Sequence, residues 1–223
     1  QELQDHYPGR AGEIVDQLST DELIALATGD PAKDQGASAL GSAGQTVPGA
    51  AAETVNAAEK DPYNVASIVL ADGPAGLRLR SEYQVRADGS VDGGDFLDGF
   101  ENGYFAEPKE PTGTVYHQYC TAIPVGTLLA QSWNLDLMKK LGQMIAGEMN
   151  EFEVTLWLAP GMSLHRNPLC GRNFEYYSED PLLAGRMASA MTLGVQSVPG
   201  CGTTIKHYAC NNQEDNRMGS DSI

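Results

Sequence analysis

The sequence predicts an α/β fold built from parallel strand and helix units, because short apolar runs alternate with helical segments. The apolar runs lie at 67–71, 154–159 and 202–208, and between them are segments whose apolar side chains recur every three or four positions. Strands that alternate with helices form parallel sheets, and a (β/α)8 barrel repeats this unit over about 250 residues. We therefore expect these 223 residues to form a partial TIM-type barrel, its first strands only.

Residues 1–66 have a different character and are expected to form a leader that precedes the barrel. Ser19 and Glu22 have the spacing of a capping box, which predicts a helix over 19–28. The following stretch, 31–58, is rich in Ala, Gly and Ser. That composition fits a flexible linker, and the alternative is an ordered loop under the active site.

The barrel part is expected to begin at residue 67 and to continue to residue 223. Its first strand, 67–71, is a continuous apolar run ended by Asp72, Gly73 and Pro74, as in strands that are buried on both faces. Residues 81–119 carry many Gly, Asp and Glu residues without a sustained period, so we expect a long insertion loop there.

Two helices in the barrel part are marked by capping residues. Asn134 can cap the first, which carries its apolar stripe at Met138, Leu141, Ile145, Met149 and Phe152. Asp180, with Pro181 at the first helical position, can cap the second, which carries its stripe at Leu183, Met187, Ala190, Met191 and Val195.

Charge and cysteine usage narrow the classes of partner. Fourteen basic and thirty acidic residues give a net charge of −16, which repels phosphate backbones and anionic lipids, so we expect neither nucleic acid nor a membrane as partner. The four cysteines, Cys120, Cys170, Cys201 and Cys210, show no spacing typical of zinc sites, so we expect free thiols, no metal and no cofactor. Residues 1–10 lack the pattern of a targeting peptide, and the cytoplasm is the expected compartment.

Polar residues that could bind a sugar follow the first strand. Asp72 comes directly after it and Arg78 six residues later, with Gly73 and Pro74 forcing a turn between them. A carboxylate can accept hydrogen bonds from two vicinal hydroxyls, and a guanidinium can donate to a neighbouring sugar oxygen. The alternative is that Asp72 satisfies the backbone of its own turn.

The ends of the other two strands add further cations. The turn-rich stretch 167–181 combines a guanidinium, carboxylates, amides and paired aromatic residues, and Arg172 is its best placed cation. Its structural alternative is an ion pair with one of three carboxylates, Glu175, Glu179 or Asp180. The third run, 202–208, contains Lys206 beside His207. Adjacent strand residues face opposite sides, so both can reach a ligand only at a strand terminus.

Three stretches, 70–78, 167–181 and 204–214, resemble in order the motifs of family 3 of the glycoside hydrolases, which contains many β-glucosidases and β-xylosidases. The run 47–54 is also similar to a segment that precedes the barrel in some bacterial members, except that Ala52 stands where Gly is usual. In the family, five matching residues line the sugar subsite beside the cleaved bond. These are Asp72, Arg78, Arg172, Lys206 and His207.

The resemblance implies a retaining hydrolase that cleaves terminal β-linked sugars from a β-glycoside or oligosaccharide with two carboxyl groups. The family's nucleophile is an Asp usually followed by Trp, and no Asp-Trp occurs here, so we expect it beyond Ile223. The acid/base residue is also expected outside 1–223, in an α/β sandwich domain that can precede the barrel. This chain alone is then expected to be inactive, completed by the remaining barrel and the sandwich domain from the same gene or another copy.

The other carboxylates of the barrel part are given structural duties. We expect them to cap helices and to hold Arg172, Lys206 and Arg217 in place. They are Glu175, Glu179, Asp180, Glu214 and Asp215.

Two other functions stay open from the sequence. A non-catalytic sugar-binding or regulatory module would keep the same pocket without a nucleophile. A thiol or metal hydrolase would pair Cys170 or Cys210 with His165 or His207. Three parallel strands alone would also leave an unpaired sheet edge, which isolated domains avoid.

Overall fold

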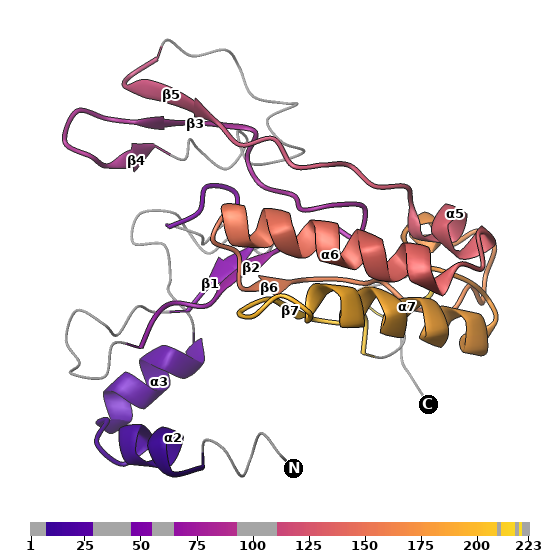
Figure 1. Cartoon of the computed structure of the whole chain (residues 1–223), viewed down its shortest axis with the longest axis horizontal. Helices are drawn as coiled ribbons and strands as arrows, with labels where there is room; N and C mark the ends of the chain where they lie inside the picture. Colours follow the sequence, from indigo (N-terminus) through magenta and orange to yellow (C-terminus); the bar gives the residue numbers. More distant parts are fainter. Residues whose placement is uncertain are drawn as a thin grey trace.

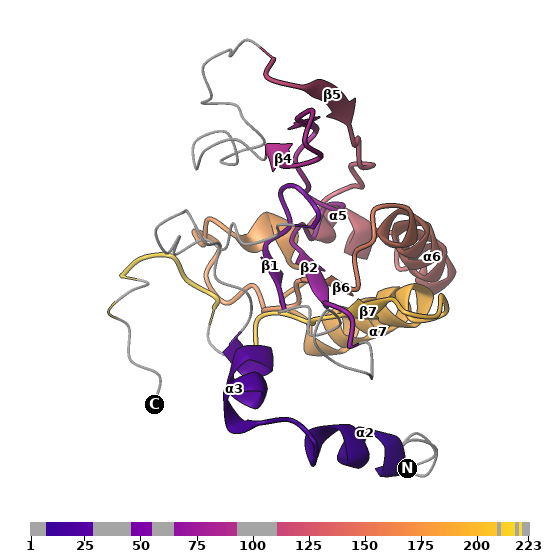
Figure 2. The ribbon, with the colours of Figure 1, turned by 90° about the vertical axis from the view of Figure 1, so that its left-hand side faces the viewer.

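A computed structural model of the chain describes residues 8–28, 46–54, 65–92, 111–208, 211–216 and 219. A central sheet lies in the middle of the molecule, and two long helices, α6 and α7, run side by side along one of its faces (Figures 1 and 2). A second, smaller sheet projects from the top of the views, and two short N-terminal helices lie at the bottom.

The central sheet confirms the predicted α/β class. Its strands are β1 (Ala52–Glu53), β2 (Val69–Ala71), β6 (Leu156–Trp157) and β7 (Gly202–Thr203), in the order β1-β2-β6-β7. Strands β2, β6 and β7 are parallel, with Leu70 opposite Leu156 and Leu156 opposite Gly202. All three lie inside the predicted apolar runs and are shorter than those runs.

Strand β1 comes from the stretch 1–66 that was expected to be a leader. It pairs antiparallel with β2, Ala52 opposite Leu70, so the β2 edge of the sheet is covered. Residues 46–54 are ordered, in a stretch for which a flexible linker and an ordered loop under the active site were both open, while 31–45 and 55–58 lie outside the described residues. Strand β1 has only two residues, Ala52 and Glu53, which is too short for a periodic pattern. Its pairing with β2 could therefore not be predicted from the sequence.

The predicted helix caps are present in α6 (Leu135–Glu151) and α7 (Pro181–Val195). The side chain of Asn134 accepts a hydrogen bond from the Leu137 N–H at 3.0 Å, and that of Asp180 accepts one from the Leu182 N–H at 2.7 Å. Each cap satisfies a backbone donor that the first turn of a helix leaves without a partner.

Helices α6 and α7 pack closely because small residues face each other. A Cβ added to Gly142 of α6 would lie 2.3 Å from the carbonyl oxygen of Met191 in α7, so only glycine allows this approach. The side chains buried between the helices and the sheet are Met138, Ile145, Ala146, Met149, Trp157, Met187, Met191 and Val195. This apolar core fixes the helices on the sheet.

The insertion at 81–119 is not simply a loop, and that expectation was wrong for its described parts. Strands β3 (Glu82–Val85), β4 (Val91–Asp92) and β5 (Thr114–His117) form an antiparallel sheet in the order β4-β3-β5. None of the residues of these strands whose exposure is described is buried. A sheet that buries neither face needs no apolar alternation, which is why the sequence shows no period of two here.

The N-terminal helices are α2 (Pro8–Val15) and α3 (Thr20–Thr28). The capping box of α3 is confirmed: the Ser19 N–H donates to Glu22 at 2.8 Å, and the Glu22 N–H donates to the Ser19 hydroxyl at 3.3 Å. Within the described residues, the remaining elements are α5 (Gly126–Gln131) and the 3-10 turn η2 (Asn173–Glu175). In the described part of the chain, no helix has the length and apolar character that crossing a membrane requires.

Candidate functional site

A tight turn after β2 returns Arg78 to the side of Asp72. The Gly76 N–H donates to the Gly73 carbonyl at 3.1 Å, and the Arg78 N–H donates to the Asp72 carbonyl at 2.8 Å. Gly73 has φ +115°, and an added Cβ would lie 1.9 Å from the Gly76 oxygen, so this turn requires glycine. The Trp157 indole of β6 donates to the Gly73 carbonyl at 2.9 Å and ties the turn to the next strand.

Asp72 holds two cations, one from its own turn and one from the far strand. Its Oδ2 lies 2.6 Å from Arg78 Nη2, and its Oδ1 lies 2.5 Å from Lys206 Nζ. Lys206 follows β7 and forms a parallel backbone bridge with Gly161, which follows β6. The carboxyl ends of the three parallel strands therefore meet here. Carboxyl ends of parallel strands are where α/β folds place their ligand sites.

The electrostatics of Asp72 favour its charged form. Burial would by itself raise the pKa of Asp72, but the hydrogen bond and charge of Lys206, with the Gly73 N–H and Arg78, hold that pKa below its ordinary value of 3.8. The Asp72 side chain is 24% exposed and that of Lys206 15%. The carboxylate is therefore both ionised and reachable from solvent.

Arg172 forms an ion pair with Glu175, one of the three carboxylates expected as possible partners from the sequence. Its Nε–H donates to Glu175 Oε1, and its guanidinium lies 6.0 Å from the centre of the Tyr176 ring. Burial would lower the pKa of Arg172, but the bond to Glu175 raises it. A guanidinium has five N–H donors and this bond uses one, so the ion pair and a ligand role are compatible.

His207 lies in a small polar cluster that sequence reasoning missed. Its Nδ1 lies 2.9 Å from the Tyr176 hydroxyl and 3.1 Å from the Asn211 amide nitrogen, which itself donates to that hydroxyl at 2.9 Å. Lys206 and His207 both follow the end of β7 at Thr203. Two adjacent residues can face the same ligand only at such a strand terminus. Tyr176 and Asn211 stand in the stretches 167–181 and 204–214, but only the fold brings them together.

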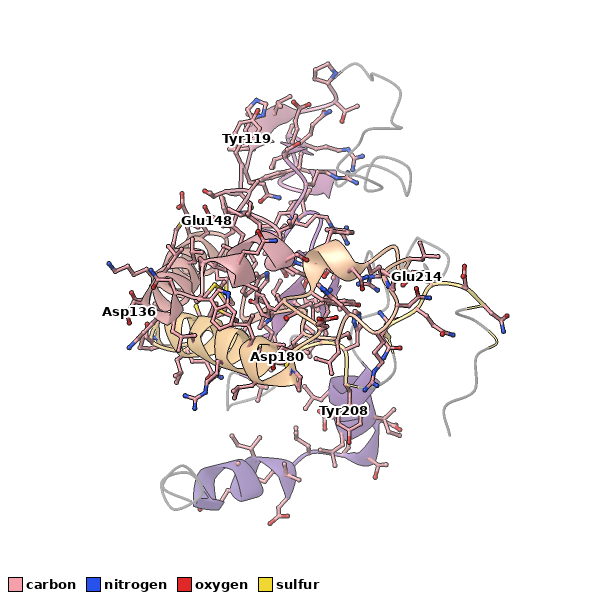
Figure 3. The ribbon with its side chains drawn as sticks, turned by 90° about the vertical axis from the view of Figure 1, so that its right-hand side faces the viewer. Tyr119, Asp136, Glu148, Asp180, Tyr208 and Glu214 are labelled. Carbon is pink, nitrogen blue, oxygen red and sulfur yellow. The ribbon has the colours of Figure 1, made fainter. Side chains whose placement is uncertain are left out.

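The remaining carboxylates occupy separate places. Asp180 caps α7 and Glu175 holds Arg172, as expected, while the charge of Glu214 also raises the pKa of Arg172. Figure 3 shows Glu214 on the C-terminal segment, on the opposite side of the view from Asp136 of α6. Glu179 and Asp215 are exposed, and Arg217 lies outside the described residues.

The described residues show no Cys–His hydrogen bond that would support a thiol hydrolase. The Nε2 of His165 lies 3.1 Å from the Tyr176 carbonyl oxygen, and His207 directs Nδ1 at Tyr176 and Asn211. Cys120, Cys170 and Cys201 are free, and Cys210 lies outside the described part. The described residues also hold no group of three or more His, Cys, Asp or Glu side chains that could bind a metal ion.

Sequence comparison decides the family. The pattern of the glycosyl hydrolase family 3 N-terminal domain matches residues 107–221, just over half of the chain. The chain belongs to glycoside hydrolase family 3. The match covers Arg172, Lys206 and His207 and lies after Asp72 and Arg78, so the second and third motif stretches fall inside it.

Two relatives in the family are named β-glucosidases. The chain is 53% identical over 102 residues to β-glucosidase A of Butyrivibrio fibrisolvens, covering 46% of this chain and 12% of that protein. It is 37% identical over 159 residues to thermostable β-glucosidase B of Acetivibrio thermocellus, covering 71% of this chain and 18% of that protein. The chain thus spans less than a fifth of these two family 3 relatives.

The fold is also that of family 3 structures. β-Glucosidase 3B of Thermotoga neapolitana, in complex with glucose, superimposes with a TM-score of 0.67 at 39% identity. The superposition covers 93% of this chain and 24% of the other. The mixed α/β arrangement described above is therefore shared with a family 3 β-glucosidase.

Proposed function

We propose that this chain is the first part of a (β/α)8 barrel in a retaining glycosidase, and that it binds the terminal sugar of a β-glucoside or β-xyloside. Five side chains would form the sugar subsite: Asp72, Arg78, Arg172, Lys206 and His207. The observation that carries the proposal is the ionised Asp72 carboxylate, held between Arg78 and Lys206 at the carboxyl ends of the parallel strands. Membership of family 3 supports the same assignment.

The chemistry of these groups suits a polyhydroxylated ligand. Ionised Asp72 is an acceptor only, so vicinal hydroxyls can both donate to it, while Lys206 and Arg172 are donors only. The Asp72–Lys206 ion pair and the Arg172–Glu175 ion pair hold the acceptor and the donors at fixed positions before the sugar arrives. Such preorganised charged groups bind hydroxyls more strongly than neutral ones do.

The bond-breaking groups would come from outside residues 1–223. A retaining mechanism needs a nucleophile and an acid/base group about 5 to 5.5 Å apart, which form and then hydrolyse a glycosyl-enzyme. We place the nucleophilic Asp beyond Ile223 and the acid/base residue in another domain of the same protein. Two carboxylates that interact with Arg172 support this placement, because Glu175 forms an ion pair with that cation and the charge of Glu214 raises its pKa.

Asp72→Asn in the complete polypeptide tests the site. It replaces an acceptor with a mixed donor and acceptor, and each charge-assisted bond is worth about 1.5 to 3 kcal/mol, so kcat/KM for p-nitrophenyl β-glucoside or β-xyloside should fall by at least about 10-fold. Asp88→Asn, on the exposed β3–β4 turn, is the matched control and should change it less than about twofold. A loss below about threefold in Asp72→Asn would reject the assignment.

Trapping with a fluorinated glycoside separates the enzyme from a binding module. His207→Ala should weaken binding yet still form the covalent glycosyl-enzyme, because we assign His207 to binding a hydroxyl and not to the chemical step. A complete wild-type polypeptide that binds sugar but neither turns over nor becomes labelled would instead establish a non-catalytic sugar-binding module.

A further inference from the structure

We propose that Asn211 fixes the tautomer of His207, so that Nδ1 accepts a hydrogen bond and Nε2 carries the proton. Tyr176 holds both residues in this arrangement. Three contacts define the cluster: Tyr176 hydroxyl to His207 Nδ1 at 2.9 Å, Asn211 Nδ2 to the same Nδ1 at 3.1 Å, and Asn211 Nδ2 to the Tyr176 hydroxyl at 2.9 Å. Neither Tyr176 nor Asn211 has a place in the proposed sugar subsite.

Donor and acceptor accounting assigns the proton. The Tyr176 hydroxyl can donate or accept, so its contact with Nδ1 is compatible with either tautomer of His207. The Asn211 amide nitrogen can only donate, and it has two hydrogens for its two contacts. A proton on Nδ1 would face an amide hydrogen across 3.1 Å, whereas a bare Nδ1 accepts it. Asn211 therefore decides the tautomer.

Tyr176 is held rigidly enough to act as the anchor of the cluster. Its side chain is fully buried, and its carbonyl accepts from the Thr127 hydroxyl at 3.0 Å. Its ring meets the His207 imidazole edge-on at 5.9 Å between centres, and Arg172 lies over the same ring at 6.0 Å. Burial raises the pKa of Tyr176 above its ordinary value of 10.0, so the hydroxyl keeps its proton.

The consequence for ligand recognition rests on the proposed function, while the tautomer does not. A neutral imidazole protonated on Nε2 presents a donor there, and its acceptor nitrogen is already used by the cluster. His207 would then bind a sugar hydroxyl through that hydroxyl's oxygen. The opposite tautomer would present an acceptor and compete with Asp72 for hydroxyl hydrogens.

Nitrogen NMR of the complete polypeptide labelled with 15N-histidine tests the tautomer without substrate. The His207 signals are assigned by their loss in His207→Gln, and an unprotonated ring nitrogen resonates far downfield of a protonated one. We expect the downfield signal at Nδ1 in the wild type and in Tyr176→Phe, which keeps Asn211. Asn211→Asp replaces the donor with an acceptor of nearly the same shape, so Nδ1 should become protonated.

Controls and kinetics separate the tautomer from general effects of charge. Gln213→Glu adds the same charge two residues away at an exposed position and should leave the wild-type tautomer. Asn211→Asp should lower kcat/KM by roughly 10-fold, against less than about twofold for Gln213→Glu. Tyr177→Phe is the control for Tyr176→Phe, since Tyr177 is a buried neighbour.

The outcomes are decisive in either direction. A wild-type His207 protonated on Nδ1 overturns the proposal, and so does a tautomer that stays unchanged in Asn211→Asp. If Asn211→Asp does not fold, the wild-type spectrum and Asn211→Ala, which removes the donor, carry the same test. An inactive wild type with the expected tautomer would refute the proposed function and leave this inference standing.

Discussion

The two sheets of this molecule are stabilised in different ways. The central sheet and helices α6 and α7 enclose side chains with no exposed surface, among them Ile145, Met149 and Trp157. The β4-β3-β5 sheet buries none of the described strand residues and is joined by backbone pairing and by the stacked rings of Tyr83 and Tyr116, 5.6 Å between centres. Apolar burial supplies most folding free energy, so the first region should resist opening far more than the second.

Deletion of core side chains should show the largest contrast. Ile145→Ala removes a fully buried side chain and should lower the opening free energy of the α6 and α7 amides by about 2 to 5 kcal/mol. Val115→Ala changes a half-buried side chain of β5 and should lower the opening free energy of the β3–β5 amides by less than about 1 kcal/mol. Hydrogen exchange measured by mass spectrometry reports both opening free energies. Equal decreases in the two regions would contradict the difference in stabilisation between the two sheets.

Two glycines on the same helix should behave in opposite ways. Gly142→Ala places a Cβ 2.3 Å from the Met191 carbonyl oxygen and should destabilise the helix pair by about 1 to 3 kcal/mol. Gly147→Ala meets no atom within 4 Å and should stabilise by about 0.5 to 1 kcal/mol through helix propensity. Hydrogen exchange of α6 gives both values. A destabilising Gly147→Ala would show that propensity does not govern the exposed face.

The pH dependence of stability should come from Asp72 rather than from Asp88, although both have a lowered pKa. A carboxyl with a lowered folded pKa stabilises the fold above its unfolded pKa, and this contribution disappears as pH falls through the folded value. The urea midpoint of the wild type should exceed that of Asp72→Asn by a constant amount above about pH 5, and the gap should close below 3.8.

Asp88→Asn is the comparison in the smaller sheet. The pKa of Asp88 is lowered by bonds to Ser90, two residues away on an exposed turn, and the unfolded chain can form such local bonds too. Above about pH 5, the midpoint difference should therefore be smaller than for Asp72→Asn. A larger difference for Asp88→Asn would contradict the assignment.

The smallest expected effect is the coupling of the two stacked tyrosines. A double-mutant cycle of Tyr83→Ala and Tyr116→Ala should give a coupling of about 0.5 to 1 kcal/mol in the opening of β3 and β5, because the rings lie directly opposite each other. The pair of His117 and Tyr119, also stacked, is outside that register and serves as an independent cycle. Absence of coupling would leave backbone pairing as the main support of this sheet.

Features with local causes could be predicted from the sequence. The caps at Ser19, Asn134 and Asp180 satisfy donors only two or three residues away, so residue types at fixed spacing identify them. The parallel strands β2 and β6 could also be predicted, because their largely buried residues lie in continuous apolar runs. Strand β7 is half-buried and begins a run that includes polar residues. The short strands β1, β3, β4 and β5 contain no continuous apolar run.

The sequence predicted the residues of the candidate site but not the contacts between them. Asp72 and Lys206 were each named, yet their ion pair depends on the register of strands separated by most of the chain. The cluster of Tyr176, Asn211 and His207 depends on the same register, since its members follow β6 and β7. Residue types give the chemistry available, and the tertiary fold decides which groups meet.

The contact between Asp72 and Lys206 also sets an order of events during synthesis. The two residues are 134 positions apart, and the strands of the central sheet stand in the same order in space as in the chain. At about 5 to 20 residues per second, a ribosome needs roughly 7 to 27 s after Asp72 before it adds Lys206. The Asp72 carboxylate therefore emerges long before its second cation, and the site is completed only when the third parallel strand joins the sheet.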